Sequence, residues 1–354
     1  MEFPALTSQA EFEAAQQEFF EILQNNPDDP ALLLLNAQLT FFGNGNRVIS
    51  GGDGDDSLYG TDENENIAGM DGNDFISAGS GDDVLYGGLG NDELVGGAGN
   101  DEFLGSQGSD RIFGETGDDL IFAGSGLNAE SQLVFGGDGN DTITTGDNDD
   151  EIDGGAGNDD ISSRAGDDII LAGEGNDTVN AGADPGIGES IENDKDLIEG
   201  EGGDDLLFGE FDDDDIFGGS GNDTLDGGGV ASTNFDPSDS SSEITNIEPV
   251  ENAGVDYLTG DAGTDTFVFG VEAGVYYASE GFDDVGIVTD FNPTEDKIQL
   301  AGSAEDYVLE LTYEGTSIFL DSDNNGVLSD TDDEIAVVEG VSDLDLGSSD
   351  FTFV

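Results

Sequence analysis

Residues 87–104 read GGLGNDELV followed by GGAGNDEFL, two consecutive nine-residue units that share six identical letters. Working outward from them, the same unit recurs 20 times between Gly51 and Val268, with insertions near residues 127–131, 185–195 and 229–253. Position 6 of the unit is Asp in 18 of the 20 copies, and position 8 is apolar in all of them. A fixed period of this kind indicates a repeat architecture, in which each unit is stable only when stacked on its neighbours.

The chemistry of the unit predicts its conformation. Only two or three residues around position 8 can form a strand, and one of their side chains then points inward. The glycines at positions 1 to 4 permit the tight turn that brings the chain back. Two units therefore make one coil of 18 residues, and the 20 units predict about ten coils of stacked parallel strands. The fold class that follows is mainly all-β, a parallel β-roll solenoid.

The regular aspartates predict bound cations. Position-6 carboxylates stacked about 4.8 Å apart would repel one another unless a hard cation lay between them. Aspartate oxygens and turn carbonyls together offer the six to eight oxygen ligands that Ca²⁺ takes, whereas Mg²⁺ fits a carbonyl cage less well. The alternative is a solvated acidic surface, which would not require Asp to recur at one position of a nine-residue period. The candidate calcium ligands in the repeats are Asp56, Asp74, Asp83, Asp92, Asp101, Asp110, Asp119, Asp141, Asp150, Asp159, Asp168, Asp177, Asp196, Asp205, Asp214, Asp223, Asp256 and Asp265.

Composition excludes several classes of function. The 354 residues contain 84 Asp and Glu against 5 Lys and Arg, which gives a formal charge of −79. Without a counter-cation, such a polyanion binds neither nucleic acid nor an anionic membrane surface. The chain has no Cys and no His, so disulfides, thiolate metal sites and the Ser-His-Asp triad are ruled out. No apolar run is long enough to cross a bilayer.

The repeats resemble the GGxGxDxUx units of RTX, or hemolysin-type calcium-binding, proteins. The resemblance rests on GGDGDDSLY at 51, GGLGNDELV at 87, GGAGNDEFL at 96, GGDGNDTIT at 136 and GGAGNDDIS at 154. It implies a parallel β-roll with Ca²⁺ between successive turns on each edge, held by the position-6 Asp and turn carbonyls. The units at 60 and 209 lack the position-4 glycine and depart from this pattern. The stretch before the repeats places Arg47 at position 6, either as a guanidinium in place of an ion or as a simple end effect.

Both ends of the chain differ from the repeats. In residues 1–46, Ser8 with Glu11 fits a capping box, and a second helix is expected over residues 31–42. This segment is expected to be a helical hairpin that caps the first coil, with a docking module as the alternative. Residues 47–269 are expected to form the β-roll. Residues 270–354 resemble the C-terminal part of RTX proteins, which implies an antiparallel β cap.

A second calcium site is a candidate within that cap. Asp321, Asp323, Asn325 and Asp332 match positions 1, 3, 5 and 12 of an EF-hand-like loop, with Gly326 at position 6. The TSIFL segment before it reads as a strand, so a single calcium loop and a plain acidic turn both remain open.

The repeat register also makes two predictions about the surface. The insertions fall in units 9, 15 and 19, all odd, so they are expected to emerge from one edge of the roll. The outward positions 7 and 9 of units 4, 6 and 8 are expected to form one exposed apolar patch, composed of Val84, Tyr86, Leu104, Leu120 and Phe122.

These features together predict a non-enzymatic, secreted calcium-binding RTX protein that folds on calcium outside the cell. A structural, adhesive or cell-surface role is expected, with cell-surface polysaccharide or protein as candidate partners. The N-terminus lacks the pattern of a Sec signal, and the final DFTFV resembles the terminus of type I secretion substrates, which implies the type I secretion machinery as a partner. The alternative is a non-catalytic carbohydrate-binding module or accessory part of a polysaccharide-modifying enzyme.

Overall fold

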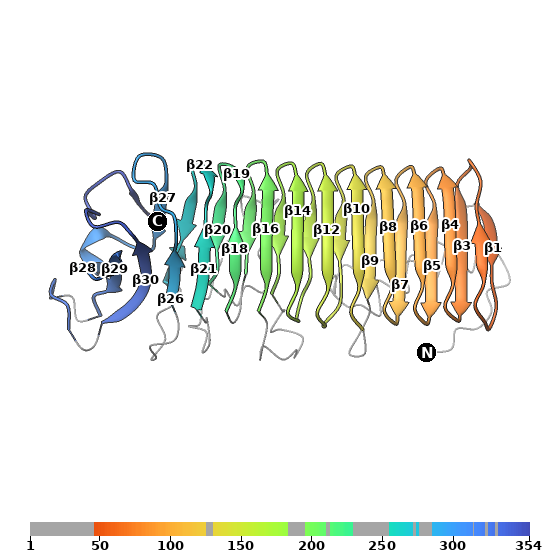
Figure 1. Ribbon diagram of the computed structural model, residues 1–354, viewed down its shortest axis with the longest axis horizontal. Helices are drawn as coiled ribbons and strands as arrows, with labels where there is room; N and C mark the ends of the chain where they lie inside the picture. Colours follow the sequence, from red (N-terminus) through yellow and green to blue (C-terminus); the bar gives the residue numbers. More distant parts are fainter. Residues whose placement is uncertain are drawn as a thin grey trace, which may run out of the picture.

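A computed structural model describes residues 46–124, 130–182, 195–209, 213–228, 255–271, 274–275, 285–313, 315–322, 325–329 and 332–354. The helical cap expected within residues 1–46 lies outside these residues, apart from Asn46. The described chain is a long β-roll built from two facing sheets of stacked strands (Figure 1). The parallel β-roll predicted from the repeat is therefore confirmed.

Across the described residues, 13 strands form one sheet and 16 form the other, named here sheet A and sheet B. Sheet A contains, in spatial order, β1 (Arg47–Ser50), β3 (Glu65–Asp71), β5 (Val84–Leu89), β7 (Glu102–Gln107), β9 (Leu120–Gly124), β11 (Thr142–Thr144), β13 (Asp160–Ser162), β15 (Thr178–Asn180), β17 (Leu206–Phe208), β20 (Thr224–Asp226), β23 (Thr266–Val268), β27 (Lys297–Leu300) and β31 (Phe351–Phe353).

Sheet B contains β2 (Ser57–Tyr59), β4 (Phe75–Ser80), β6 (Glu93–Ala98), β8 (Arg111–Thr116), β10 (Leu133–Asp138), β12 (Glu151–Ala156), β14 (Ile169–Glu174), β16 (Leu197–Gly202), β18 (Asp215–Phe217), β21 (Val255–Thr259), β26 (Val285–Val288), β30 (Asp333–Glu339), β29 (Gly315–Leu320) and β28 (Tyr307–Leu311). The short strands β19 (Ser220–Gly221) and β22 (Ala262–Gly263) extend its edge, and β24 (Gly270–Val271) pairs with β25 (Gly274–Val275). A short 3₁₀ helix covers Ala304–Asp306.

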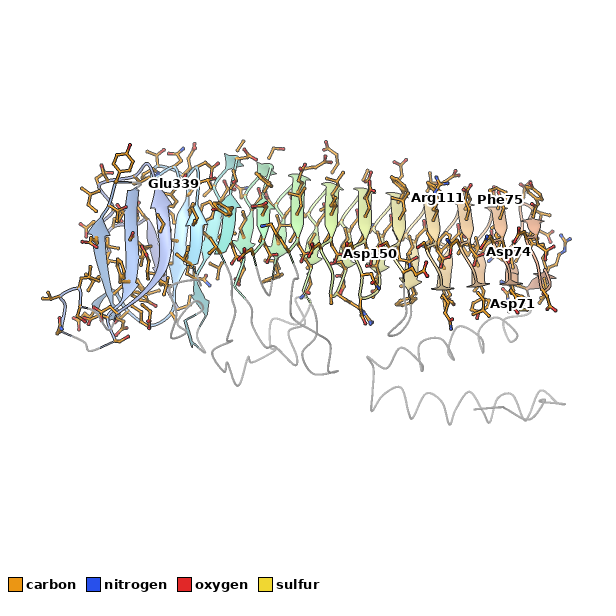
Figure 2. All side chains as sticks on the ribbon, turned by 60° about the horizontal axis from the view of Figure 1, so that its bottom comes forward. Asp71, Asp74, Phe75, Arg111, Asp150 and Glu339 are labelled. Carbon is orange, nitrogen blue, oxygen red and sulfur yellow. The ribbon has the colours of Figure 1, made fainter. Side chains whose placement is uncertain are left out.

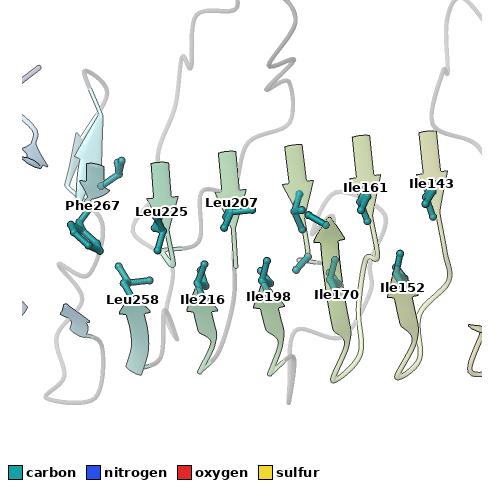
Figure 3. Close-up of a cluster of buried hydrophobic side chains, with 14 of the residues drawn as sticks. Ile143, Ile152, Ile161, Ile170, Ile198, Leu207, Ile216, Leu225, Leu258 and Phe267 are labelled. Carbon is teal, nitrogen blue, oxygen red and sulfur yellow. The ribbon is translucent and has the colours of Figure 1, made fainter. Parts of the chain in front are cut away.

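The position-8 side chains form the core. Where no insertion intervenes, each strand pairs with the strand 18 residues later, so Leu94 lies beside Ile112 and Val134 beside Ile152. All 20 position-8 residues point inward, and only Leu58 in the first coil is less than fully buried. Figure 3 shows the two rows facing each other, one from each sheet. The inward row follows directly from the apolar position 8 of the sequence.

All three insertions begin and end at the same edge of the roll. They connect β9 to β10, β15 to β16 and β20 to β21, in each case from sheet A to sheet B. We call this the A-to-B edge, and the opposite one the B-to-A edge. The shared edge predicted from the odd numbering of the units is confirmed.

The predicted outward patch is only partly as expected. Val84, Tyr86, Leu104 and Phe122 do lie on adjacent strands of sheet A. The patch is not exposed, however, because Val84 and Leu104 are only 7% and 5% accessible. Val84 packs with Ala68 and Tyr86 in a small cluster separate from the main core. The prediction of an exposed patch was therefore wrong, because outward side chains of sheet A pack against one another.

The C-terminal region combines two arrangements. Strands β28, β29 and β30 pair antiparallel, which confirms the expected β cap. Parallel pairing nevertheless continues beyond the repeats, because β26 and β30 extend sheet B while β27 and β31 extend sheet A. The last strand, β31, places Phe351 against the core. The roll is therefore longer than its recognisable repeats.

Candidate metal-binding turns

The position-6 side chains line both edges of the roll and are withdrawn from solvent. Nineteen of the 20 are at most 3% accessible, the exception being Asp56 in the first coil. Figure 2 labels two members of the A-to-B row, Asp74 and Asp150. Burying a carboxylate is unfavourable unless it is paired, hydrogen-bonded or bound to a cation.

From Asp74 in one row and Asp83 in the other, one oxygen of each position-6 carboxylate is held by a regular hydrogen-bond ladder. The backbone N–H of Asp141 donates to Oδ1 of Asp159 at 2.7 Å, and the N–H of Asp159 donates to Oδ1 of Asp177 at 2.8 Å. The ladder brings together the candidate ligands along each edge, including Asp168, Asp196, Asp214, Asp256 and Asp265. It fixes the orientation of each side chain and leaves the second oxygen, Oδ2, to face the turn.

Sequence reasoning missed a second ladder at position 5. The N–H of Asn158 donates to Oδ1 of Asn140 at 2.8 Å, and the N–H of Asn176 donates to Oδ1 of Asn158 at 2.9 Å. In this ladder the side chain accepts from the following coil, whereas the position-6 side chain accepts from the preceding one. The recurrence of Asn or Asp at position 5 was the available signal.

In most turns Oδ2 has no donor. Among the described residues, eleven such buried atoms have no hydrogen-bond partner, on Asp74, Asp83, Asp92, Asp101, Asp110, Asp119, Asp141, Asp159, Asp177, Asp205 and Asp223. In all eleven turns the position-2 residue has a left-handed backbone, whether it is glycine, as at Gly155, or not, as at Met70. We call these turns open.

Backbone oxygens approach the same place. A Cβ built on Gly136 would lie 2.5 Å from Oδ2 of Asp141 and 2.4 Å from the carbonyl oxygen of Gly154 in the next coil. Carboxylate and carbonyl oxygens thus converge beside a glycine. Within the described chain, no three acidic side chains gather into a carboxylate-only site. An ion at an open turn would therefore need backbone carbonyls, and a hard, flexible cation such as Ca²⁺ fits this donor set.

Burial also resists ionisation of these carboxyls. Removal from water raises their pKa above the usual 3.8, because it disfavours the charged form more than the backbone hydrogen bond favours it. The pKa rises to about 6 for Asp83, Asp92 and Asp141, to about 7 for Asp101, Asp119, Asp159, Asp205 and Asp265, and to about 8 for Asp110. A bound cation would instead favour the ionised carboxylates and lower these pKa values.

A smaller group of turns satisfies the second oxygen internally, and we call these turns closed. Asp56 accepts from the N–H of Gly52 at 2.7 Å, and Asp150 accepts from the N–H of Gly146 at 3.2 Å. Glu65 accepts from the N–H of Thr61 at 2.9 Å, and the guanidinium of Arg47 lies 3.7 Å from its other oxygen. Arg47 thus contacts a position-6 carboxylate while its own side chain is largely exposed, and both interpretations of this residue stay predictions.

The ladder has one member beyond the repeats that sequence reasoning missed. Asp296 accepts from the N–H of Asp265 at 3.1 Å and from the N–H of Asn292 at 2.7 Å, so it closes the B-to-A row. The sequence DKIQL, an Asp two residues before an apolar strand position, was the signal.

The EF-hand-like loop lies in the hairpin between β29 and β30, so TSIFL is a strand as predicted. The loop folds around its own backbone. Asp321 accepts from the N–H of Gly326 at 2.7 Å, and Asp332 accepts from the N–H of Ser329 at 2.8 Å. Asn325 accepts from the N–H of Val327, and Asp323 lies outside the described residues. Calcium binding at this loop stays a prediction.

Comparison with known families agrees with the turn geometry. A family model described as the RTX calcium-binding nonapeptide repeat matches residues 43–64, 59–94, 95–129, 128–161, 135–170, 154–186, 192–229 and 252–272. Because these matches together cover more than half of the 354 residues, the chain belongs to this family. No curated protein matches the chain. Calcium is therefore the cofactor of these repeats, as the sequence predicted.

Proposed function

We propose that this protein is a non-enzymatic, secreted calcium-binding protein whose roll folds when calcium binds outside the cell. The observation that carries the proposal is the set of eleven buried carboxylate oxygens without a donor. A buried, unpaired anion is strongly unfavourable in a folded protein. A divalent cation at the open turns would supply the missing charge and bring neighbouring coils together.

The candidate ligands at these turns are the position-6 aspartates, with the turn carbonyls completing the coordination shell. We propose that residues 47–269 form the calcium-dependent unit and that residues 270–354 terminate it. Since no coil is stable alone, losing the ions should unfold many coils at once. A chain kept expanded at low cytosolic calcium would suit export by a type I secretion machinery, and the higher calcium outside would then drive folding.

An adhesive or cell-surface role is consistent with the outer face of sheet B. Phe113 and Phe135 stack there with ring centroids 5.2 Å apart, and Arg111 lies over the Phe113 ring while pairing with Glu93. Phe75 and Arg111 are labelled on this face in Figure 2. Among the described residues, no helix has the length and hydropathy of a membrane span.

Far-UV circular dichroism and size-exclusion chromatography of the full chain, in chelator and in millimolar Ca²⁺, test the proposal. We expect β-structure and a compact radius only with Ca²⁺, and a much weaker response to the same concentration of Mg²⁺. Identical spectra and radii in chelator and calcium would contradict it.

A further inference from the structure

The two edges of the roll differ in how many of their turns are open. On the B-to-A edge, nine consecutive turns have a left-handed residue at position 2, from Gly79 to Asp261. Their position-6 residues run from Asp83 to Asp265, and eight of the nine have an Oδ2 without a partner in the described chain. Between the closed turns of Glu65 and Asp296, this edge therefore carries eight successive open turns, from Asp83 to Asp223.

The A-to-B edge begins in the same way but does not continue. Asp74, Asp92 and Asp110 stand in three successive open turns. The next two positions along this row are Gln132 and Asp150, and both have internal partners. The first series of open turns on this edge thus has three members, and a left-handed residue stands again at position 2 only beyond Asp150, at Arg164 in the turn of Asp168.

Gln132 interrupts the row by replacing an oxygen with a donor. Its Oε1 accepts from the N–H of Asp110 at 2.9 Å, so it takes the ladder role of an aspartate Oδ1. Its Nε2 takes the place of an aspartate Oδ2, and donates to the carbonyl oxygen of Gly108 at 2.8 Å and to that of Glu130. Because this amide is only 3% accessible and its N–H groups point at turn carbonyls, it satisfies oxygens that would otherwise face a cation.

Asp150 interrupts the row by a change of backbone. Gly146 precedes it at position 2 and, unlike the same position in open turns, does not take up the left-handed conformation. Its N–H therefore donates to Oδ2 of Asp150 at 3.2 Å. Burial, the largest effect, raises the pKa of this carboxyl to about 6, while hydrogen bonds from Thr145, Gln132 and Gly146 act in the opposite direction. Both oxygens of the Asp150 carboxylate therefore accept hydrogen bonds from the chain.

We propose that the B-to-A edge carries a continuous series of calcium ions, and that the series on the A-to-B edge is broken at Gln132 and Asp150, where donors of the chain replace the ion. The three insertions leave the roll from this second edge. The inference rests on the proposed calcium binding, and adds which turns bind. Calcium then stabilises the roll mainly along the B-to-A edge, while the A-to-B edge contains units that depart from the repeat.

Two neighbouring aspartates provide a matched test. Asp150 and Asp159 are each 3% accessible, and each accepts one N–H from the preceding coil, from Gln132 at 2.6 Å and from Asp141 at 2.7 Å. They differ in Oδ2, which is bonded in Asp150 and without a partner in Asp159. The variants D150N and D159N therefore make the same chemical change on opposite edges.

Native mass spectrometry of the full chain in calcium counts the bound ions in each variant. We expect D159N to bind at least one ion fewer than the wild type, and D150N to bind the same number. The pair E65Q and D83N repeats the comparison within the B-to-A edge, with loss expected only for D83N. This second pair keeps the test decisive if D159N fails to fold.

Equal loss of ions in D150N and D159N would overturn the proposal, as would no loss in D159N. In both cases a wild type that still binds calcium leaves the proposed function intact. A wild-type chain that binds no calcium would instead refute the proposed function itself.

Discussion

Adding one methyl group at a stacked turn should separate two coils. Gly157 has φ +140°, and a Cβ built on it would lie 1.7 Å from the carbonyl oxygen of Gly139 in the preceding coil. Because real Cβ atoms essentially never approach closer than 3.0 Å, the Gly157→Ala variant must shift the two turns apart by more than 1 Å. That is a large fraction of the ~4.8 Å spacing between strands.

The cost follows from the contacts that this shift disturbs. Between these two coils, the N–H of Gly139 donates to the carbonyl of Ala156 at 2.7 Å, and the N–H of Asn158 donates to Oδ1 of Asn140 at 2.8 Å. Two weakened hydrogen bonds contribute about 2 kcal/mol. An alanine held at this backbone conformation adds roughly 1–3 kcal/mol. We therefore expect a destabilisation of about 3–5 kcal/mol.

Thermal unfolding in saturating Ca²⁺, followed by circular dichroism, measures the effect. For a roll of this size, such a loss lowers Tm by on the order of 10 °C. Gly54→Ala is the matched control, since nothing lies within 4 Å of its Cβ and its φ is not left-handed. It should leave Tm unchanged or raise it slightly. Equal Tm values for the two variants would refute the argument that stacked turns require glycine at position 4.

Two further predictions concern the core and the carboxyls. Ile161→Ala removes a fully buried side chain and should lower the free energy of unfolding in urea by about 2–5 kcal/mol. Ile169→Ala, at an outward site that is 46% exposed, should lower it far less. Similar losses of stability in the two variants would mean that the assignment of inward positions is wrong. The pKa values of buried carboxyls such as Asp101 and Asp159 are raised from 3.8 to about 7, so in chelator the folded chain holds protons more tightly than the unfolded chain. This contribution to stability is fully present below about pH 4 and is lost as the pH rises towards 7. Circular dichroism in chelator should therefore show more β-structure at pH 5 than at pH 8. Because protons should compete with Ca²⁺ for the carboxylates, the calcium concentration at the midpoint of folding should rise as the pH falls. A midpoint independent of pH would contradict the assignment of these carboxyls as ligands.

The sequence by itself determined the periodic features of the protein. An apolar residue at every position 8 can be buried only if all units share one phase, and this fixes the strand register and the inward row. An Asp at nearly every position 6 places carboxylates at both edges for the same reason. The odd numbering of the three interrupted units was enough to assign the insertions to one edge. These properties follow from counting, because each coil repeats the one before it.

Only the tertiary structure decided which turns are open. Local propensity suggests that glycine at position 2 adopts the left-handed backbone and that other residues avoid it. The structure shows the reverse at several turns, since Met70 and Glu115 are left-handed while Gly146 is not. Met70 lies in register with left-handed Gly88, and Glu115 with left-handed Gly97 and Gly137. At these two positions the backbone matches that of a stacked neighbour, whereas left-handed Gly79 stacks on Thr61, which is not left-handed. Hydrogen bonds between coils outweigh the preference of the single residue, and this is why the donor set at each carboxylate could not be predicted from its own nine residues.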